Sequence, residues 1–297
     1  MRILVFIKEV PDIKIPLEYD EQFRGLRPEG QVKQLNPPDR AALNASLRIK
    51  EHLFETHITV IHLGGVSGER WIRDGLALGC DEGLRICFDG IDGVHAPGKA
   101  LIFSRIAEIL GFDLILTGTK GFDTASGHVG ILMACRLGVP HVNSVVEVEL
   151  KWKDRNLIAR KRLDRGFQER IQCRLPSVIS VEAKEGFEKS ASFTALLDAT
   201  EKDIPCWNLA QIGIPREHVI QADSLLRFGS LRFPQPRLQI LPAPDVLLPT
   251  FERIKKLLEG TIQRREGRVL KQDEDRLVDE LFQTLLDEGW LNHLRKE

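Results

Sequence analysis

The sequence lacks three features that would place the chain in a specialised class of protein. Its 42 lysine and arginine residues nearly equal its 43 aspartate and glutamate residues, so the formal net charge is −1 and nucleic acid is not an expected partner. It has no apolar run long enough to cross a bilayer, so we expect no direct membrane insertion. The first residues, MRILVFI, enter a strand without a signal peptide's cleavage site, which favours a cytoplasmic location.

Cysteine motifs and catalytic motifs are also missing. The cysteines form no CxxC pair, so we expect a reducing compartment, buried thiols and no metal site. They are Cys80, Cys87, Cys135, Cys173 and Cys206. No HExxH, GxSxG, Walker or GxGxxG sequence occurs. We therefore expect no catalytic residues, and a chain that is not itself an enzyme.

Apolar runs that suit strands alternate with amphipathic stretches that suit helices over the first half of the chain. The expected strands are residues 2–7, 57–63, 84–88 and 112–116, and the expected helices are residues 40–52, Gly68 to Leu78, 99–110 and 128–137. This alternation predicts an α/β fold with an open, mostly parallel sheet flanked by helices. An antiparallel extension is predicted at residues 144–152, 156–163 and 169–174, followed by a buried strand at 176–181.

Periodicity is lost beyond residue 182. We expect an α/β domain at residues 1–182, an extended arm at 183–249 and a C-terminal helical extension at 250–297. Because the arm has several prolines and few apolar runs, we expect it to lie across a partner subunit. Amphipathic helices are predicted at 251–258 and 274–290, which either pack on one another or dock a partner.

The stretch from Phe112 to Gly130, FDLILTGTKGFDTASGHVG, joins a predicted strand to a predicted helix through a polar, glycine-bearing loop. In open α/β sheets, ligands bind in such loops, and the N–H groups at the start of the next helix favour an anion. Thr124, Ser126 and Gly127 suit phosphate oxygens. Asp123 would accept a bond from a ribose hydroxyl or, more often for such a residue, from its own loop.

Other residues are expected beside this loop. Lys8 and Lys120 would add positive charge, and His128 is expected to contact a ligand or the helix start rather than act as a base. A second glycine loop, Gly64 to Gly68, also joins a strand to a helix, an arrangement that admits phosphate and is also common for geometric reasons alone. If the sheet is parallel, both loops lie at one edge.

Five segments, read together, resemble one known family. They are MRILVFIKEVPD, LNPPDRAALNASLRIKE, VIHLGGVSGERWIRDGLALGCDEGL, LTGTKGFDTASGHVGILMACRLGVP and LDRGFQERIQCRLPSVISVE. Their order and spacing resemble those of the electron transfer flavoprotein beta subunit. The resemblance covers most of residues 1 to about 200, and residues beyond about Gly213 extend past the usual end of the family.

The resemblance implies a fold, cofactors and partners. It implies an adenine nucleotide alpha hydrolase-like, Rossmann-like domain that holds AMP or a second FAD, in a heterodimer whose alpha subunit carries the redox FAD. Electrons would arrive from acyl-CoA or related dehydrogenases and leave to a quinone-linked oxidoreductase, the electron transfer flavoprotein–quinone type. DTASGHVG departs from the AMP-type loop, so AMP and a second FAD both stay open. Arg162 stands where many members of the family have an acidic residue that steers the FAD domain through an ion pair, so we expect that steering to differ here.

Two groups of site residues follow from the loops and the resemblance. The expected cofactor-binding residues are Lys8, Asn36, Pro37, Asp39, Gly64, Gly65, Val66, Gly118, Gly121, Asp123, Thr124, Ala125, Ser126, Gly127, His128 and Val129. The family's partner-recognition loop aligns with Ser190 to Ala199, whose docking residues would be Phe193, Ala195 and Leu196. A nucleotide-binding regulatory module of universal-stress type is the main alternative. An adenylating enzyme ranks last, because Gly64-Gly65-Val66-Ser67 is only faintly similar to the SGGxDS-like loop that such an enzyme needs.

Overall fold

A computed structural model describes residues 1–15, 19–20, 25–26, 31–88, 90, 93–183, 189–224, 226, 248–259 and 274–287. The chain divides into two compact units, Met1–Arg232 and Phe233–Glu297.

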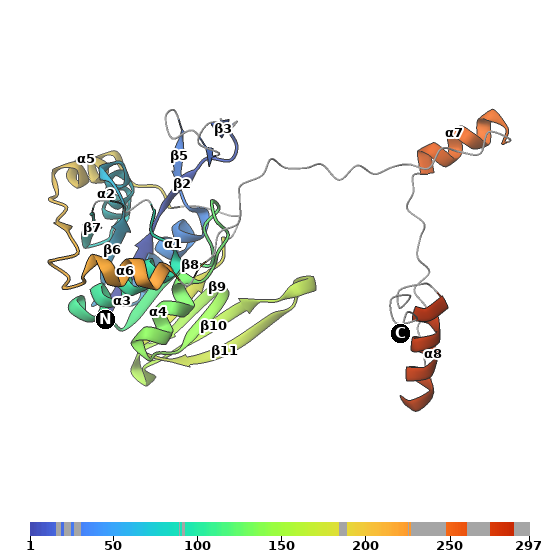
Figure 1. The fold of residues 1–297 in the computed structure, drawn as a ribbon. Coiled ribbons are helices and arrows are strands. Elements are labelled where there is room, and N and C mark those ends of the chain that lie inside the picture. The colour runs from blue at the N-terminus through green and yellow to red at the C-terminus, as the bar shows by residue number, and fades with distance from the viewer. Residues whose placement is uncertain are drawn as a thin grey trace. The chain divides into compact units, whose positions relative to one another are not determined.

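The centre of the first unit, in the described residues, is a nine-stranded sheet with the order β11-β10-β9-β12-β8-β1-β6-β7-β13 (Figure 1). Its strands are β1 (Arg2–Ile7), β6 (His57–Leu63), β7 (Glu82–Ile86), β8 (Leu114–Gly118), β9 (His141–Lys151), β10 (Asn156–Arg162), β11 (Gln168–Arg174), β12 (Ser177–Val181) and β13 (Cys206–Trp207). From β9 to β13 in that order every pairing is parallel, while β10 pairs antiparallel with β9 and β11. The predicted α/β fold with an antiparallel extension is confirmed.

Helices cover both faces of this sheet. They are α1 (Pro37–His52), α2 (Glu69–Leu78), α3 (Ala96–Leu110), α4 (Val129–Leu137), α5 (Phe193–Glu201) and α6 (Arg216–Asp223). Two short antiparallel pairs precede α1, β2 (Glu9–Pro11) with β5 (Lys33–Leu35) and β3 (Tyr19–Asp20) with β4 (Gly25–Leu26). Single 3₁₀ turns occur at Val66–Gly68, Trp152–Asp154 and Asp164–Gly166.

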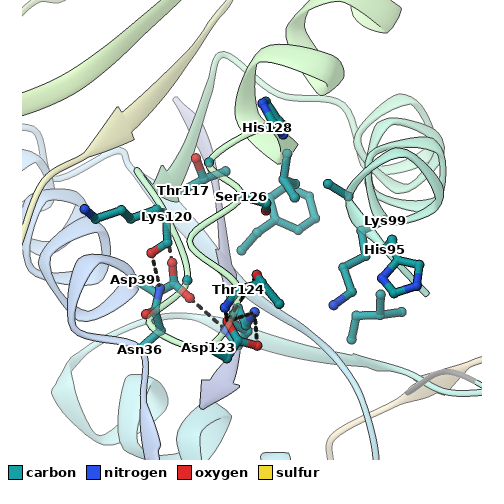
Figure 2. A pocket seen from close by; sticks show the side chains of 18 of the residues that line it. Asn36, Asp39, His95, Lys99, Thr117, Lys120, Asp123, Thr124, Ser126 and His128 are labelled. Carbon is teal, nitrogen blue, oxygen red and sulfur yellow. Dashed lines mark hydrogen bonds and ion pairs between the residues drawn. The ribbon is translucent and has the colours of Figure 1, made fainter. Parts of the chain in front are cut away.

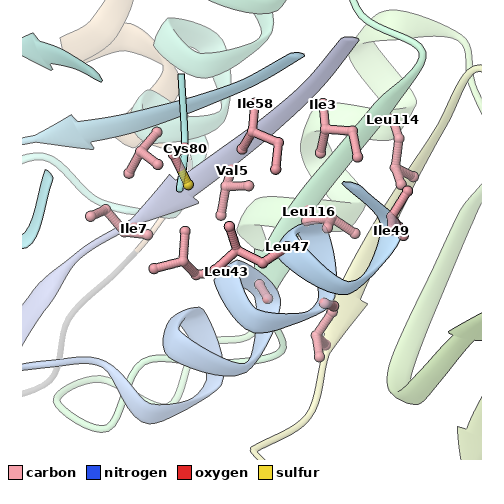
Figure 3. Close-up of a cluster of buried hydrophobic side chains, with 14 of the residues drawn as sticks. Ile3, Val5, Ile7, Leu43, Leu47, Ile49, Ile58, Cys80, Leu114 and Leu116 are labelled. Carbon is pink, nitrogen blue, oxygen red and sulfur yellow. The ribbon is translucent and has the colours of Figure 1, made fainter. Parts of the chain in front are cut away.

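Strand β1 shows why both faces need helices. Successive side chains of a strand point to opposite faces, and every residue of β1 after Arg2 is buried. Ile3, Val5 and Ile7 belong to the apolar cluster that includes α1 (Figure 3). Leu4 and Phe6 belong to a second cluster, which includes α3, α4 and α6. A strand with apolar residues at every position is thus buried on both sides, as a central parallel strand must be.

Most predicted elements occur, with shifted ends. The strand predicted at 84–88 is observed as Glu82–Ile86, and that predicted at 112–116 as Leu114–Gly118. Helix α1 begins at Pro37 rather than at Arg40, because proline is well tolerated in the first helical turn.

The described part of residues 183–249, which we expected to form an extended arm, contains regular structure. Helices α5 and α6 and strand β13 lie there, and β13 extends the sheet of the same chain beside β7. Ile204, Ile212 and Val219 are buried in the two apolar clusters. These helices have only nine and eight residues, too few for a clear period to stand out in the sequence.

The prediction that all cysteines are buried thiols is wrong. Cys87 and Cys206 pair as a disulfide across 119 residues, with their Cα atoms 6.6 Å apart, because β13 lies beside β7. Cys135 is exposed on α4, whereas Cys80 and Cys173 are buried thiols as expected.

The second unit contains the two helices predicted from amphipathic patterns, α7 (Thr250–Glu259) and α8 (Glu274–Asp287). The predicted end of the last helix, at 290, lies outside the described residues. No helix among the described residues is both long and apolar enough to cross a membrane.

Candidate functional site

A cavity of about 380 Å³ lies at the carboxyl ends of β1, β6 and β8. Its size is within the range of small-molecule sites, and carboxyl ends of parallel strands are where such sites form in open α/β sheets. The sheet order places β1 between β6 and β8, so the loops after these strands converge there.

Eleven of the predicted cofactor-binding residues line this cavity. They are Lys8, Asn36, Asp39, Gly118, Gly121, Asp123, Thr124, Ser126, Gly127, His128 and Val129. The other five predicted residues, Pro37, Gly64, Gly65, Val66 and Ala125, are not among its lining residues. The structure therefore brings together the loops after β1 and β8 and the start of α1 (Figure 2).

Asp39, on the first turn of α1, ties these three segments together. Its carboxylate accepts hydrogen bonds from the backbone N–H of Lys8 at 2.9 Å and of Gly118 at 2.9 Å. Burial raises the pKa of Asp39 to about 7, although Asn36 and the two N–H groups favour its ionised form. A Cβ on Gly118 would lie 2.8 Å from the Cβ of Pro38, so only glycine fits against the helix there.

Asn36, directly before α1, holds the loop after β8. Its side-chain N–H donates to the carbonyl of Lys120 at 3.0 Å, and its oxygen accepts from the N–H of Phe122 at 3.2 Å. Asn36 is 1% exposed, so these bonds satisfy a buried amide. Asn36 and Asp39 thus build the cavity wall through bonds to the chain itself.

Asp123 pairs with Lys8 across the cavity rim. The ammonium lies 2.7 Å from the carboxylate, which also accepts from the N–H of Thr124 at 2.8 Å. Burial opposes ionisation, but these bonds from Lys8 and Thr124 hold the pKa of Asp123 below its usual value. Capping of its own loop, one of the two expected roles of Asp123, is therefore observed.

The turn before α4 presents free backbone donors. Within the described part of the chain, the N–H groups of Ser126, Gly127 and His128 have no hydrogen-bond acceptor. The loop reaches this geometry through left-handed conformations at Ala125 (φ 51°) and Gly127 (φ 62°). Unpaired N–H groups at the start of a nine-residue helix attract an anion, since the helix dipole is positive there.

The opposite wall of the cavity was not predicted from the sequence. Val94, His95, Ala96, Lys99 and Phe103 line it from the start of α3, and Leu226 lines it from the turn after α6. The signal for α3 was available, because Ala96-Pro97 marks a helix start after strand β7 and hence at the same sheet edge. No local signal identifies Leu226.

The second glycine loop has a structural role that does not depend on a ligand. A Cβ on Gly64 or Gly68 would collide with the imidazole ring of His62, which is 1% exposed. Of the β6 end, only Leu63 lines the cavity. The glycines there make room for a buried histidine.

The predicted docking segment forms α5, whose Ser192 caps the helix by accepting from the N–H of Ala195 at 3.2 Å. Phe193 is 75% exposed and Leu196 is 43% exposed, whereas Ala195 packs against the apolar core. The described residues contain no group of three or more side chains that would hold a metal ion.

Comparison with known proteins identifies the family of this chain. Residues 26–210 match the model of the electron transfer flavoprotein domain. An electron transfer flavoprotein subunit beta from Thermoanaerobacterium thermosaccharolyticum is 31% identical over 68% of this chain and 76% of that protein. The chain belongs to the electron transfer flavoprotein beta-subunit family. The family resemblance stated from the sequence is confirmed, and with it a role in electron transfer.

Two further relatives agree with this family. The caffeyl-CoA reductase–Etf complex subunit CarD of Acetobacterium woodii is 29% identical over 73% of this chain and 82% of its own. The electron transfer flavoprotein subunit beta of Methylophilus methylotrophus is 25% identical over 79% of this chain and 89% of its own. The family model ends at residue 210, before α6 and Leu226, whereas the match to the Methylophilus methylotrophus protein covers 79% of this chain and extends past them.

Proposed function

We propose that the cavity binds the phosphate and adenosine parts of an adenine nucleotide, either AMP or a second FAD. The observation that carries the proposal is the row of N–H groups at Ser126, Gly127 and His128, which have no acceptor among the described residues and face a cavity within the size range of small-molecule sites. Lys99 and His95 supply basic groups on the opposite wall. These residues fit an anionic ligand that also carries an apolar ring.

Around that ligand the chain's own residues have distinct roles. The start of α4 would hold phosphate oxygens, and the hydroxyls of Thr124 and Ser126 would add donors. Asn36 and Asp39 would act indirectly, by fixing the loops that the ligand contacts. A bound flavin would supply the redox chemistry. No residue of this chain is proposed to break or form a covalent bond.

The proposed assembly is a heterodimer with an electron transfer flavoprotein alpha subunit that carries FAD. Electrons would pass from an acyl-CoA or related dehydrogenase, through this pair, to a quinone-linked oxidoreductase in the cytoplasm. Support for a CoA-ester partner comes from CarD, whose name places it in a caffeyl-CoA reductase–Etf complex. The division into residues 1–182, 183–249 and 250–297 stays a proposal about function, with the middle part bearing the docking helix.

Ser126→Asp is expected to weaken nucleotide binding by at least about tenfold, because a carboxylate beside the proposed phosphate position repels the phosphate group. Binding of AMP and of FAD would be measured by calorimetry on the purified complex stripped of nucleotide. Gln168→Asp, exposed on β11, adds the same charge away from the cavity and should bind normally. Equal nucleotide affinity in the two variants would contradict the proposed phosphate position.

Phe193→Ala is expected to slow electron transfer from the partner dehydrogenase by roughly tenfold, because a large exposed aromatic side chain is a typical docking contact. Stopped-flow reduction of the complex gives the rate, and nucleotide content should stay at the wild-type level. Phe54→Ala, which removes a 90% exposed phenyl group from the loop after α1, is the matched control. Normal reduction of the Phe193 variant would exclude this residue from docking.

A further inference from the structure

The turn after α6 supplies a wall of the cavity, although it lies beyond the family-matched residues. Helix α6 buries Val219 and Ala222 and packs along α3. Its last residue, Asp223, accepts a bond through its carbonyl from the N–H of Leu226 at 2.9 Å. The side chain of Leu226, 37% exposed, lines the cavity.

The carboxylate of Asp223 caps helix α3. It accepts from the N–H of His95 at 2.8 Å and from the N–H of Gly98 at 2.7 Å. His95 precedes the helix and offers no side-chain cap of its own. Asp223 therefore supplies, from a segment 125 residues away, the acceptor that a local capping side chain usually provides.

Gly98 makes room for this cap. A Cβ at residue 98 would lie 2.9 Å from one Asp223 carboxylate oxygen and 2.8 Å from the nearest Val94 methyl carbon. Glycine is a poor helix former, so its presence in the first turn of α3 fits this steric need. Asp223 and Gly98 act as a matched pair.

This cap also determines where an anion is able to bind. Two of the N–H groups at the start of α3 are already taken by Asp223, whereas those before α4 are open. Among the described residues, the start of α4 therefore offers more unpaired N–H donors to an anion than the start of α3. On the α3 side, Val94, Phe103 and Leu226 line the cavity with apolar side chains, which suit an apolar ring. His95 and Lys99 lie on the same side (Figure 2).

We propose that Leu226 and Asp223 determine ligand specificity at this site. Leu226 packs against the planar ring of the bound nucleotide, adenine or isoalloxazine. Asp223 is a positioning residue that fixes the α3 start, from which His95 and Lys99 line the cavity. The proposal rests on the proposed function and extends the nucleotide site to residues beyond the family model, which ends at residue 210.

Leu226→Ala tests the ring contact. The full chain with its alpha subunit, stripped of nucleotide, would be titrated with AMP, with FAD and with ribose 5-phosphate, which has no ring. The dissociation constants of AMP and FAD are expected to rise roughly tenfold, from the loss of apolar contact area, and that of ribose 5-phosphate to stay unchanged. The control is Ile220→Ala, at a residue of α6 that is 60% exposed, and this variant should bind all three ligands normally.

Unchanged affinity for both nucleotides in Leu226→Ala, or an equal loss for ribose 5-phosphate, would overturn the ring contact while leaving the proposed function intact. A wild-type complex that binds neither AMP nor FAD would overturn both proposals. The two failures are therefore distinguishable in one set of titrations.

Asp223→Ala tests the positioning role. Asp223→Ala is expected to weaken AMP binding roughly tenfold. Asp223→Asn keeps one acceptor oxygen and is expected to weaken AMP binding less. Both variants would be titrated well below their Tm. A purely structural role would lower the Tm and leave the affinity of the folded complex for AMP unchanged, and that result would overturn the assignment.

Discussion

Asp39→Ala is expected to lower the free energy of unfolding by about 3 kcal/mol and to abolish nucleotide retention. The substitution leaves the N–H groups of Lys8 and Gly118 without their acceptor in a buried setting, and each unpaired group costs about 1–3 kcal/mol. These two N–H groups lie where strands β1 and β8 end. Without the carboxylate, the strand ends that form the cavity wall lose their hydrogen bonds to Asp39 of α1. Urea unfolding gives the stability, and nucleotide content after gel filtration gives retention.

A matched substitution separates the lost acceptor from the lost volume. Asp39→Asn keeps one oxygen that is able to accept from Lys8 or Gly118, so its stability should fall between those of the wild type and the alanine variant. Asp74→Ala removes a carboxylate that pairs with Arg40 from the neighbouring α2 and should cost about 1 kcal/mol or less. Equal stabilities of Asp39→Ala and Asp74→Ala would contradict the role of Asp39.

Acid is expected to destabilise the protein through His62, by about 3 kcal/mol between pH 6.5 and pH 4. Burial lowers the pKa of His62 to about 4, and its Nδ1 has no hydrogen-bond partner among the described residues. The unfolded chain, with an ordinary histidine pKa near 6.5, therefore binds more protons in this range. Stability is full above pH 6.5 and is lost as the pH falls towards 4.

The contribution of His62 is measured as a difference in stability between the wild type and a His62 variant. This comparison is needed because the raised pKa of Asp39 changes the free energy of unfolding with pH in the opposite direction. The folded state binds more protons than the unfolded state between the ordinary aspartate pKa and about 7, so the Asp39 contribution falls as the pH rises. His62→Gln cannot titrate, and the wild type should lose about 3 kcal/mol relative to it on acidification. His218→Gln, exposed on α6, is the control, and parallel pH curves for wild type and His62→Gln would contradict the account.

Much of the fold was predictable because local pattern and topology agree. The strand of Ile3 to Ile7 is apolar at every position, which only a strand covered on both faces tolerates. A parallel arrangement then places the ends of β1, β6 and β8 at one edge. The residues of the loop after β8 could therefore be assigned to a common site without coordinates.

The roles of individual residues were harder to predict. Asn36 and Asp39 were expected to contact a cofactor, and the structure shows their side chains bonded to other loops of the chain. Gly64 was expected at a phosphate, and the structure shows in addition that a side chain there would collide with the ring of His62. Such roles depend on which segment meets which in space, and one sequence does not contain that information locally.

The wall formed by α3, Asp223 and Leu226 was missed for the same reason. Asp223 caps a helix that begins more than 120 residues earlier, through bonds that no spacing rule predicts. The short helices α5 and α6 also show no long apolar period in the sequence. Each buries only a few residues, α5 against α2 and α6 against α3.

The most direct test of the nucleotide proposal is the nucleotide content of the intact complex. The full chain would be purified with its alpha subunit, denatured, and the released nucleotides identified and counted by mass spectrometry. We predict one adenine nucleotide per beta chain, AMP or FAD, in addition to the FAD of the alpha subunit, and its loss in Ser126→Asp. A complex whose beta chain releases neither AMP nor FAD would contradict the account.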